Sequence, residues 1–315
     1  MEFRNLGKSG LKVSLAGLGC NNFAMKCNAE QTRAVVHRAL DEGINLFDTA
    51  DIYGNRGGSE EMLGKALGAR RREVIVATKF GMAMGDGPML RGGSARYIAS
   101  AAEASLKRLG TDYIDLYQIH FPDPHTPQHE TLDALNDLVR AGKVRYIGCS
   151  NFAGWQLADA TWISRAHNLA HYVSAQNEYN LLDRRIEREL IPACREYGLG
   201  ILPYFPLASG FLTGKYRRGE QPASGTRFAL MQPMAKRTLT DPNFAMLDKF
   251  EEFARARGHS MLELAIGWLG SQPEVSSVIA GATTPEQVSA NVKAVERKLE
   301  ADALAEIDKI APRPQ

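Results

Sequence analysis

A short apolar run followed at once by an ionisable residue occurs three times in the first 120 residues of this chain. Asp48, Lys79 and His120 are the three ionisable residues, and the runs before them are residues 44–47, 74–78 and 114–119. Short runs rich in β-branched and aromatic residues are typical of strands buried on both faces of a parallel sheet. A polar residue therefore stands at the carboxyl end of each predicted strand.

The same strand-then-helix unit continues along the chain. Predicted strands end at residues 48, 79, 120, 150, 176 and 204, which gives intervals of 31, 41, 30, 26 and 28 residues, the length of single βαβ units. A first strand ends near residues 17–19 and an eighth spans 275–280. Helical patterns cover 29–42, 59–67, 95–109, 131–141, 154–166, 185–197, 243–257 and 260–269. We predict one α/β domain over residues 1–315, a (β/α)8 TIM barrel.

Three further features complete the predicted fold. An N-terminal hairpin pairs residues 3–4 with 12–13, a long functional loop follows strand 7 over residues 207–242, and a C-terminal helix lies near 301–311. A doubly wound sheet is the alternative, but the segment Gly17-Leu18-Gly19-Cys20-Asn21-Asn22 lacks the third glycine of the dinucleotide fingerprint. In a barrel all strands end at one mouth, where active sites of that architecture lie.

The polar residues at this mouth suit acid–base chemistry. Tyr53 lies five residues after Asp48 on the loop that overhangs the barrel. A phenol has a pKa of about 10, and we expect the ammonium of Lys79 to lower it. Asp48 can hold Lys79 by an ion pair, and His120 can hydrogen-bond a substrate oxygen. The alternative is Schiff-base chemistry, which requires a lysine that no carboxylate neutralises.

A second polar feature follows the eighth strand. Thr284 is suited to cap a helix, Pro285 to its first position, and Gln287 to complete a capping box. The free N–H groups of such a helix start point at the mouth and favour an anion.

Composition excludes several other functions. A hydrophobic content of 44% over 315 residues supports a large core, and a net charge of +2 is too small to indicate nucleic-acid or membrane binding. No run approaches the roughly 18 apolar residues of a membrane span. Four cysteines show no metal-ligand spacing, and the prolines around His125 and His129 disfavour a helical metal site, so we predict no metal. A cytoplasmic protein with reduced thiols is expected.

Six ordered motifs across nearly the whole chain resemble the aldo-keto reductase superfamily, in the branch that also contains the potassium-channel β subunits. The motifs are Phe47-Asp48-Thr49-Ala50-Asp51-Ile52-Tyr53-Gly54, Ala77-Thr78-Lys79, Asp115-Leu116-Tyr117-Gln118-Ile119-His120, Gly148-Cys149-Ser150-Asn151-Phe152, Gln176-Asn177-Glu178-Tyr179-Asn180 and Pro206-Leu207-Ala208-Ser209-Gly210. The resemblance implies a barrel that binds NADPH and reduces an aldehyde or ketone. Asp48, Tyr53, Lys79 and His120 match the family's catalytic tetrad, with Tyr53 as proton donor.

The resemblance also implies a set of cofactor-binding residues. Ser150, Asn151 and Gln176 match the side chains that hold the nicotinamide carboxamide, and Tyr204 matches the aromatic residue under the ring. Leu207, Ser209 and Lys215 match family positions that cover the pyrophosphate and contact phosphate. Arg227 matches the arginine that contacts the 2′-phosphate. Gly281 and Thr283 fall at the 2′-phosphate end, with Gln287 and Asn291 near the adenine. Ala290 departs from the family, because relatives usually have a glutamate there that contacts the adenine amine.

A second function is compatible with the same resemblance. An NADPH-binding sensor subunit with little turnover is the alternative to an enzyme. The loops that would contact the substrate show no carboxylate or phosphate clamp, so a small aldehyde or ketone is the predicted partner, while its identity and the oligomeric state stay open.

Overall fold

Eight parallel strands form one curled sheet in the computed structural model, which describes residues 1–314. The strands are β3 (Ala16–Gly19), β4 (Leu46–Asp48), β5 (Ile75–Phe80), β6 (Ile114–Ile119), β7 (Val144–Ser150), β8 (Tyr172–Gln176), β9 (Gly200–Ile201) and β10 (Val278–Gly281). Neighbours pair in chain order, and β10 pairs with β3. Ile201 also bridges to Val275, and the Ser276 N–H donates to the Ile201 carbonyl at 2.9 Å, which closes the ring. The predicted barrel is confirmed.

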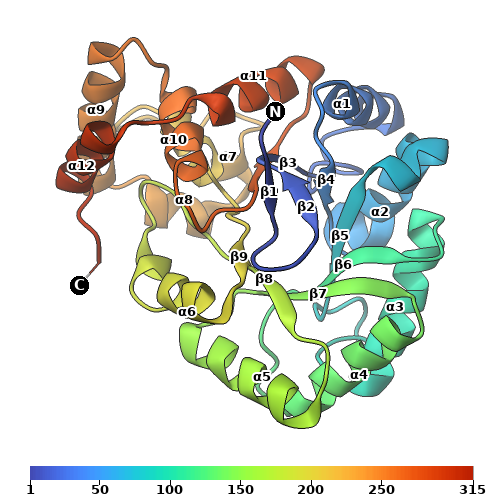
Figure 1. The fold of residues 1–315 in the computed structure, drawn as a ribbon. Coiled ribbons are helices and arrows are strands. Elements are labelled where there is room, and N and C mark those ends of the chain that lie inside the picture. Colours follow the sequence, from blue (N-terminus) through green and yellow to red (C-terminus); the bar gives the residue numbers. More distant parts are fainter. Residues whose placement is uncertain (315) are drawn as a thin grey trace.

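Helices surround the sheet (Figure 1). They are α1 (Ala29–Asp41), α2 (Tyr53–Leu67), α3 (Ala95–Leu109), α4 (Gln128–Arg140), α5 (Gly154–His167), α6 (Leu190–Tyr197), α9 (Asp241–Ala256), α10 (Met261–Gly270), α11 (Pro285–Glu296) and α12 (Ala301–Ile310). Local sequence explains their starts: Asn28 and Gln31 form a reciprocal capping box at α1. Val35, Val36 and Ala39 place the apolar stripe of α1 in the core.

Prolines make two predicted elements shorter than expected. The helix predicted over 185–197 splits into a 3-10 turn (Arg185–Glu187) and α6. Pro192 has no N–H to donate, so it fits only in the first turn of a helix, and α6 must begin just before it. The strand predicted over 200–204 is only Gly200–Ile201, because Pro203 cannot donate to the sheet.

The N-terminal hairpin lies across one end of the barrel (Figure 1). It consists of β1 (Phe3–Asn5) and β2 (Lys12–Ser14), as predicted. The Arg4 guanidinium donates to the carbonyls of Gly270, Gln272 and Val275 at 2.6–3.0 Å. The hairpin therefore covers the amino ends of the strands, and the loops at their carboxyl ends form the mouth at the opposite end.

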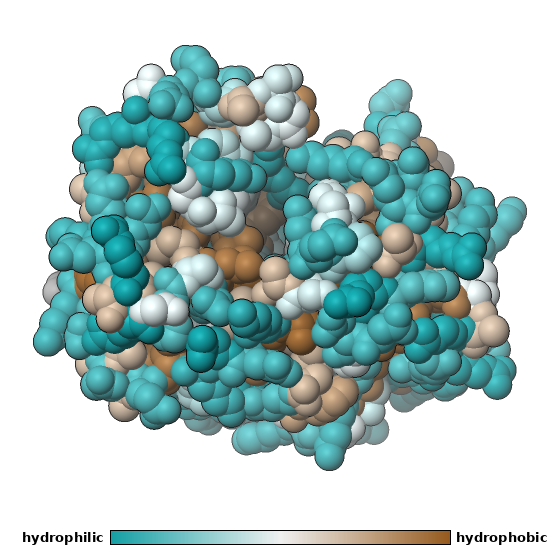
Figure 2. Space-filling model, turned by 90° about the horizontal axis from the view of Figure 1, so that it is seen from above, coloured by the Kyte–Doolittle hydropathy of each residue, from teal (hydrophilic) through white to brown (hydrophobic). Residues whose placement is uncertain are grey.

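Residues 207–242, here called the strap, follow β9. The strap contains three short helical pieces, η3 (Ala208–Thr213), α7 (Arg227–Leu230) and α8 (Gln232–Thr238). Figure 2 looks onto the side that carries α9, α11 and α1, and it shows a hollow with hydrophobic residues on its floor between hydrophilic surroundings. Among residues 1–314, every helix is too short or too polar to span a bilayer.

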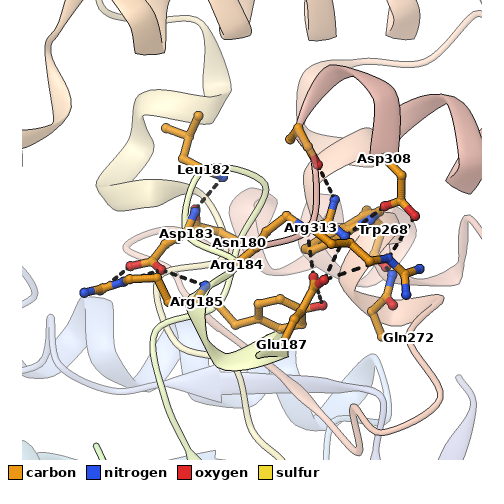
Figure 3. A network of polar contacts seen from close by, with 12 residues as sticks. Asn180, Leu182, Asp183, Arg184, Arg185, Glu187, Trp268, Gln272, Asp308 and Arg313 are labelled. Atoms are coloured by element: carbon orange, nitrogen blue, oxygen red, sulfur yellow. Dashed lines mark hydrogen bonds and ion pairs between the residues drawn. The ribbon is translucent and has the colours of Figure 1, made fainter. Parts of the chain in front are cut away.

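A buried arginine joins α12 to the barrel (Figure 3). Arg184 lies in the loop after β8 and bonds to Glu187 and Asp308 at 2.7–2.9 Å. It also donates to the Ala311 carbonyl at 2.6 Å, and its guanidinium lies 5.2 Å above the Trp268 ring. This network fixes the C-terminal helix, predicted at 301–311 and observed at Ala301–Ile310.

Candidate active site

The centre of the mouth holds a buried ion pair. Asp48 ends β4, and Lys79 lies on the neighbouring strand β5. The Lys79 ammonium donates to both Asp48 carboxylate oxygens and to the Thr49 carbonyl, each at 2.8 Å. Lys79 is fully buried and Asp48 is 4% exposed. All three ammonium hydrogens are therefore used, which argues against a Schiff-base role for this lysine.

Tyr53 and His120 lie beside this pair. The Lys79 ammonium is 5.2 Å from the centre of the Tyr53 ring, and the rings of Tyr53 and His120 meet edge to face at 5.7 Å. Tyr53 stands at the start of α2, where residues 54–57 have positive φ and interrupt the helix. This break separates Tyr53 from the regular part of α2, which agrees with the predicted helix start at residue 59. The structure thus brings the four tetrad candidates together.

Burial dominates the pKa of Tyr53. It raises the pKa above its ordinary value, and the Lys79 charge, which lowers it, does not compensate. Asp48 adds a second upward contribution. The expectation that Lys79 gives Tyr53 a lowered pKa is therefore wrong for this structure. Lys79 itself has a raised pKa in spite of its burial, because the Asp48 carboxylate favours the ammonium.

His120 is neutral at physiological pH. Burial, and then the Lys79 charge, lower the pKa of His120 to about 3. Its Nδ1 atom is buried without a hydrogen-bond partner, and its ring stacks on Phe121 with centres 5.3 Å apart. A neutral imidazole carries one N–H, so His120 can donate one hydrogen bond to a ligand oxygen.

The four residues predicted around the nicotinamide ring form one hydrogen-bonded group with the tetrad. Gln176 donates to Asp48 Oδ1 at 2.8 Å, and Ser150 donates to the Gln176 carbonyl at 2.8 Å. Asn151 donates to the His120 carbonyl at 2.9 Å and accepts from the Tyr204 hydroxyl at 2.7 Å. Asn151 has a φ of +61°, a backbone conformation that asparagine tolerates better than most residues. These contacts fix the amide groups beside the ion pair.

The other predicted cofactor residues lie on the strap and around the start of α11. Leu207 is partly buried, and the Ser209 hydroxyl donates to Met234 Sδ at 3.0 Å. Lys215 and Arg227 follow on the same segment, and Gly281 ends β10. Asn291 is only 8% exposed, so it is not an ordinary surface residue of α11.

The start of α11 differs in one detail from its prediction. Thr284 caps the helix by accepting from the Gln287 N–H, as predicted. However, the Gln287 side chain accepts from the N–H and hydroxyl of Thr283, at 2.8 and 3.1 Å, and not from the Thr284 N–H. The predicted capping box is therefore wrong, because Gln287 reaches one residue further back and orients Thr283.

Two contributions to the site were absent from our sequence prediction. The Thr49 carbonyl binds Lys79, and a backbone contact leaves no signal in a side-chain pattern. Asn177 Oδ1 is buried without a partner and, together with Asn151 and Tyr204, lines a cavity of about 330 Å³. Asn177 follows Gln176 directly in one of the six motifs, and this position could have indicated its place in the site. Within residues 1–314, no three His, Cys, Asp or Glu side chains are grouped to hold a metal.

Comparisons with known proteins agree with this geometry. The model of the Aldo/keto reductase family matches residues 16–312. A probable voltage-gated potassium channel subunit beta of Oryza sativa subsp. japonica is 39% identical over 94% of this chain and 92% of its own length. The L-glyceraldehyde 3-phosphate reductase of Escherichia coli (strain K12) is 36% identical over 98% and 92%, and the versiconal hemiacetal acetate reductase of Aspergillus parasiticus is 35% identical over 95% and 94%.

Proposed function

This chain belongs to the aldo/keto reductase family, and we propose that it reduces an aldehyde or ketone to an alcohol with NADPH as reductant. Relatives named as reductases support an oxidoreductase. The observation that carries the proposal is the arrangement of Tyr53 and a neutral His120 beside the buried Lys79–Asp48 pair. Two hydrogen-bond donors next to a fixed charge pair suit a carbonyl oxygen that becomes an alkoxide.

The residues around the mouth fit a phosphorylated dinucleotide. Asn151 and Tyr204 would hold the nicotinamide end, and the strap cations Lys215 and Arg227 would neutralise phosphate. The N-terminus of α11 offers free N–H groups, and Thr283 is oriented beside it. When bound, NADPH supplies the hydride that reduces the carbonyl carbon.

The side chains of this chain then control the proton. Tyr53 and His120 donate hydrogen bonds to the carbonyl oxygen, which draws electron density away from the carbon. As negative charge develops on that oxygen, the Tyr53 proton moves to it, because an alkoxide is more basic than a phenolate. Lys79, held by Asp48, stabilises the phenolate that remains until solvent reprotonates it.

Replacing Tyr53 by phenylalanine tests the proposal. We expect Tyr53→Phe to lose at least about a hundredfold in kcat, the usual contribution of a positioned acid, with little change in NADPH affinity. Tyr113→Phe is the matched control, since it removes a phenol hydroxyl at the amino end of β6 and should retain turnover. Equal turnover of Tyr53→Phe and the wild type would refute the role of Tyr53.

A sensor subunit with little turnover is the second candidate, because the rice relative is named as a channel β subunit. The loss of reduced-nicotinamide absorbance with a panel of carbonyl compounds separates the two. Binding of NADPH without its consumption by any carbonyl compound would favour the sensor.

A further inference from the structure

Three cationic side chains lie on two loops that contact each other at the mouth. Lys26 belongs to the loop between β3 and α1, whereas Lys215 and Arg227 belong to the strap. The Lys26 ammonium donates to the Gly225 carbonyl at 3.4 Å, across 199 residues of sequence. Within residues 1–314, none of the three cations has a carboxylate within ion-pair distance, although 21 ion pairs occur elsewhere.

The three charges act on one another. Partial burial, and then the charges of Arg227 and Lys215, lower the pKa of Lys26 below its ordinary value. Lys215 has a lowered pKa for the same two reasons, burial first and Arg227 second. Like charges placed together without a counter-charge repel each other, so this arrangement opposes folding unless an anion binds between them.

The cluster lies between the two ends of the predicted cofactor site. On one side, the Arg227 guanidinium lies 5.0 Å from the centre of the Phe205 ring. The centres of the Phe205 and Tyr204 rings are 5.1 Å apart. The charge of Arg227 also lowers the pKa of Tyr53, although burial raises it more. Arg227 is therefore close to the reacting end.

On the other side, the loop that carries Lys26 touches the start of α11. Cys27 Sγ lies 4.0 Å from the Thr283 carbonyl, and Asn22 Nδ2 lies 3.5 Å from the Ala282 carbonyl. A dinucleotide that ran from Tyr204 to the N-terminus of α11 would therefore bring its middle, the pyrophosphate, to the three cations.

We propose that Lys26 joins Lys215 and Arg227 to form a three-cation clamp on the pyrophosphate of the bound dinucleotide. The inference rests on the proposed function and adds Lys26, which the resemblance does not assign. It also gives Arg227 a different task from the 2′-phosphate contact that the resemblance implies. The 2′-phosphate is then left to Thr283 and the N-terminus of α11. Because NADPH and NADH share the pyrophosphate, the clamp binds both.

The affinities for NADPH and for NADH, compared between variants, test this assignment. Dissociation constants of NADPH and NADH are measured by fluorescence titration for the wild type, Lys26→Met and Lys26→Arg. A hydrogen bond to a charged group contributes enough binding free energy that its loss in Lys26→Met should weaken the binding of both cofactors roughly tenfold. Lys26→Arg keeps the charge and should stay within about threefold of the wild type. Lys12→Met removes a lysine at the opposite end of the barrel and should change neither constant.

Several results would overturn the clamp. A loss confined to NADPH would assign Lys26 to the 2′-phosphate, and unchanged constants would remove it from the cofactor site altogether. Unchanged cofactor binding with a raised KM for glyceraldehyde 3-phosphate, but not for glyceraldehyde, would show that the cations bind a phosphorylated substrate. Lys26→Arg as weak as Lys26→Met would refute the electrostatic role. A wild type that binds neither cofactor would instead refute the proposed function, and the clamp with it.

Discussion

Asp48→Asn is the substitution that probes the buried ion pair most directly. The carboxylate is the only negative group bonded to the Lys79 ammonium in the described structure, and it accepts two of its three hydrogen bonds. Asparagine keeps the shape and one oxygen but removes the charge. The variant therefore leaves a fully buried ammonium without its counter-ion.

The expected loss of stability follows from this burial. Removing one partner of a buried pair costs about 3–5 kcal/mol. The asparagine oxygen still accepts one hydrogen bond, so we expect the lower end, about 3 kcal/mol. At about 2 °C per kcal/mol for a domain of this size, Tm should fall by about 6 °C.

The pH dependence of stability should change as well. In the wild type the pKa of Lys79 is raised, so its contribution is fully present below the unfolded value of about 10.4 and is lost above it. In Asp48→Asn burial acts without the carboxylate, and the folded pKa of Lys79 falls below the unfolded value. The unfolded state then binds more protons, and stability rises with pH by up to about 1.4 kcal/mol per unit below about pH 10.

Urea unfolding between about pH 7 and 9 measures both effects. The double variant Asp48→Leu, Lys79→Met is the control, since replacing a buried pair by apolar residues is often neutral, and it should be more stable than Asp48→Asn. A loss below about 1 kcal/mol in Asp48→Asn, together with the same pH slope as the wild type, would refute this account of the ion pair.

Two further predictions concern buried charges outside the tetrad. Arg184→Met breaks the contacts to Glu187, Asp308 and the Ala311 carbonyl, and urea unfolding should show a loss of about 3 kcal/mol in stability. The Arg185 side chain is 75% exposed, so the control Arg185→Met should lose less than about 1 kcal/mol. Equal losses would contradict the role of this network. Burial and the Glu60 charge raise the pKa of Asp51 to about 7. The folded state holds the Asp51 proton from about pH 4 to 7, so Asp51 makes a contribution to stability that falls by up to about 1.4 kcal/mol per unit, against the opposite slope from His120, whose pKa is lowered to about 3. Asp51→Asn should therefore gain stability with rising pH, relative to the wild type, by up to about 1.4 kcal/mol per unit in this range, and the same slope in both proteins would contradict the raised pKa of Asp51.

The order of the elements and the grouping of the tetrad were predictable because both depend on local patterns. Hydrophobic runs of strand length, and the rule that parallel strands end at one mouth, suffice to place Asp48, Lys79 and His120 together. The contact of Lys26 with Gly225 was not predictable in this way. It joins two irregular loops 199 residues apart, and no periodic pattern encodes how the strap folds over the mouth.

The pKa of Tyr53 shows why knowing the residues of the site was not enough to predict the electrostatics of the site. The sequence prediction paired Lys79 with Asp48 but considered only the effect of the ammonium on the pKa of the phenol. In the structure Asp48 lies 2.8 Å from that ammonium and acts on Tyr53 with the opposite sign. The carboxylate that holds Lys79 in place therefore cancels part of its field, and the burial of the phenol outweighs the remainder.

This raised pKa predicts different pH profiles for the two directions of the reaction. Reduction consumes a proton, so the ratio of kcat/KM for reduction to that for oxidation must fall about tenfold per pH unit. A phenol whose pKa lies above about 10 stays protonated, so reduction should be flat between about pH 6 and 9. The whole pH dependence of the ratio must then appear in kcat/KM for oxidation. Oxidation needs the phenolate, so its kcat/KM should rise about tenfold per pH unit. Initial rates with one carbonyl compound and its alcohol measure both profiles. Oxidation that reaches a plateau near pH 7, while reduction falls above it, would show that Lys79 prevails over burial.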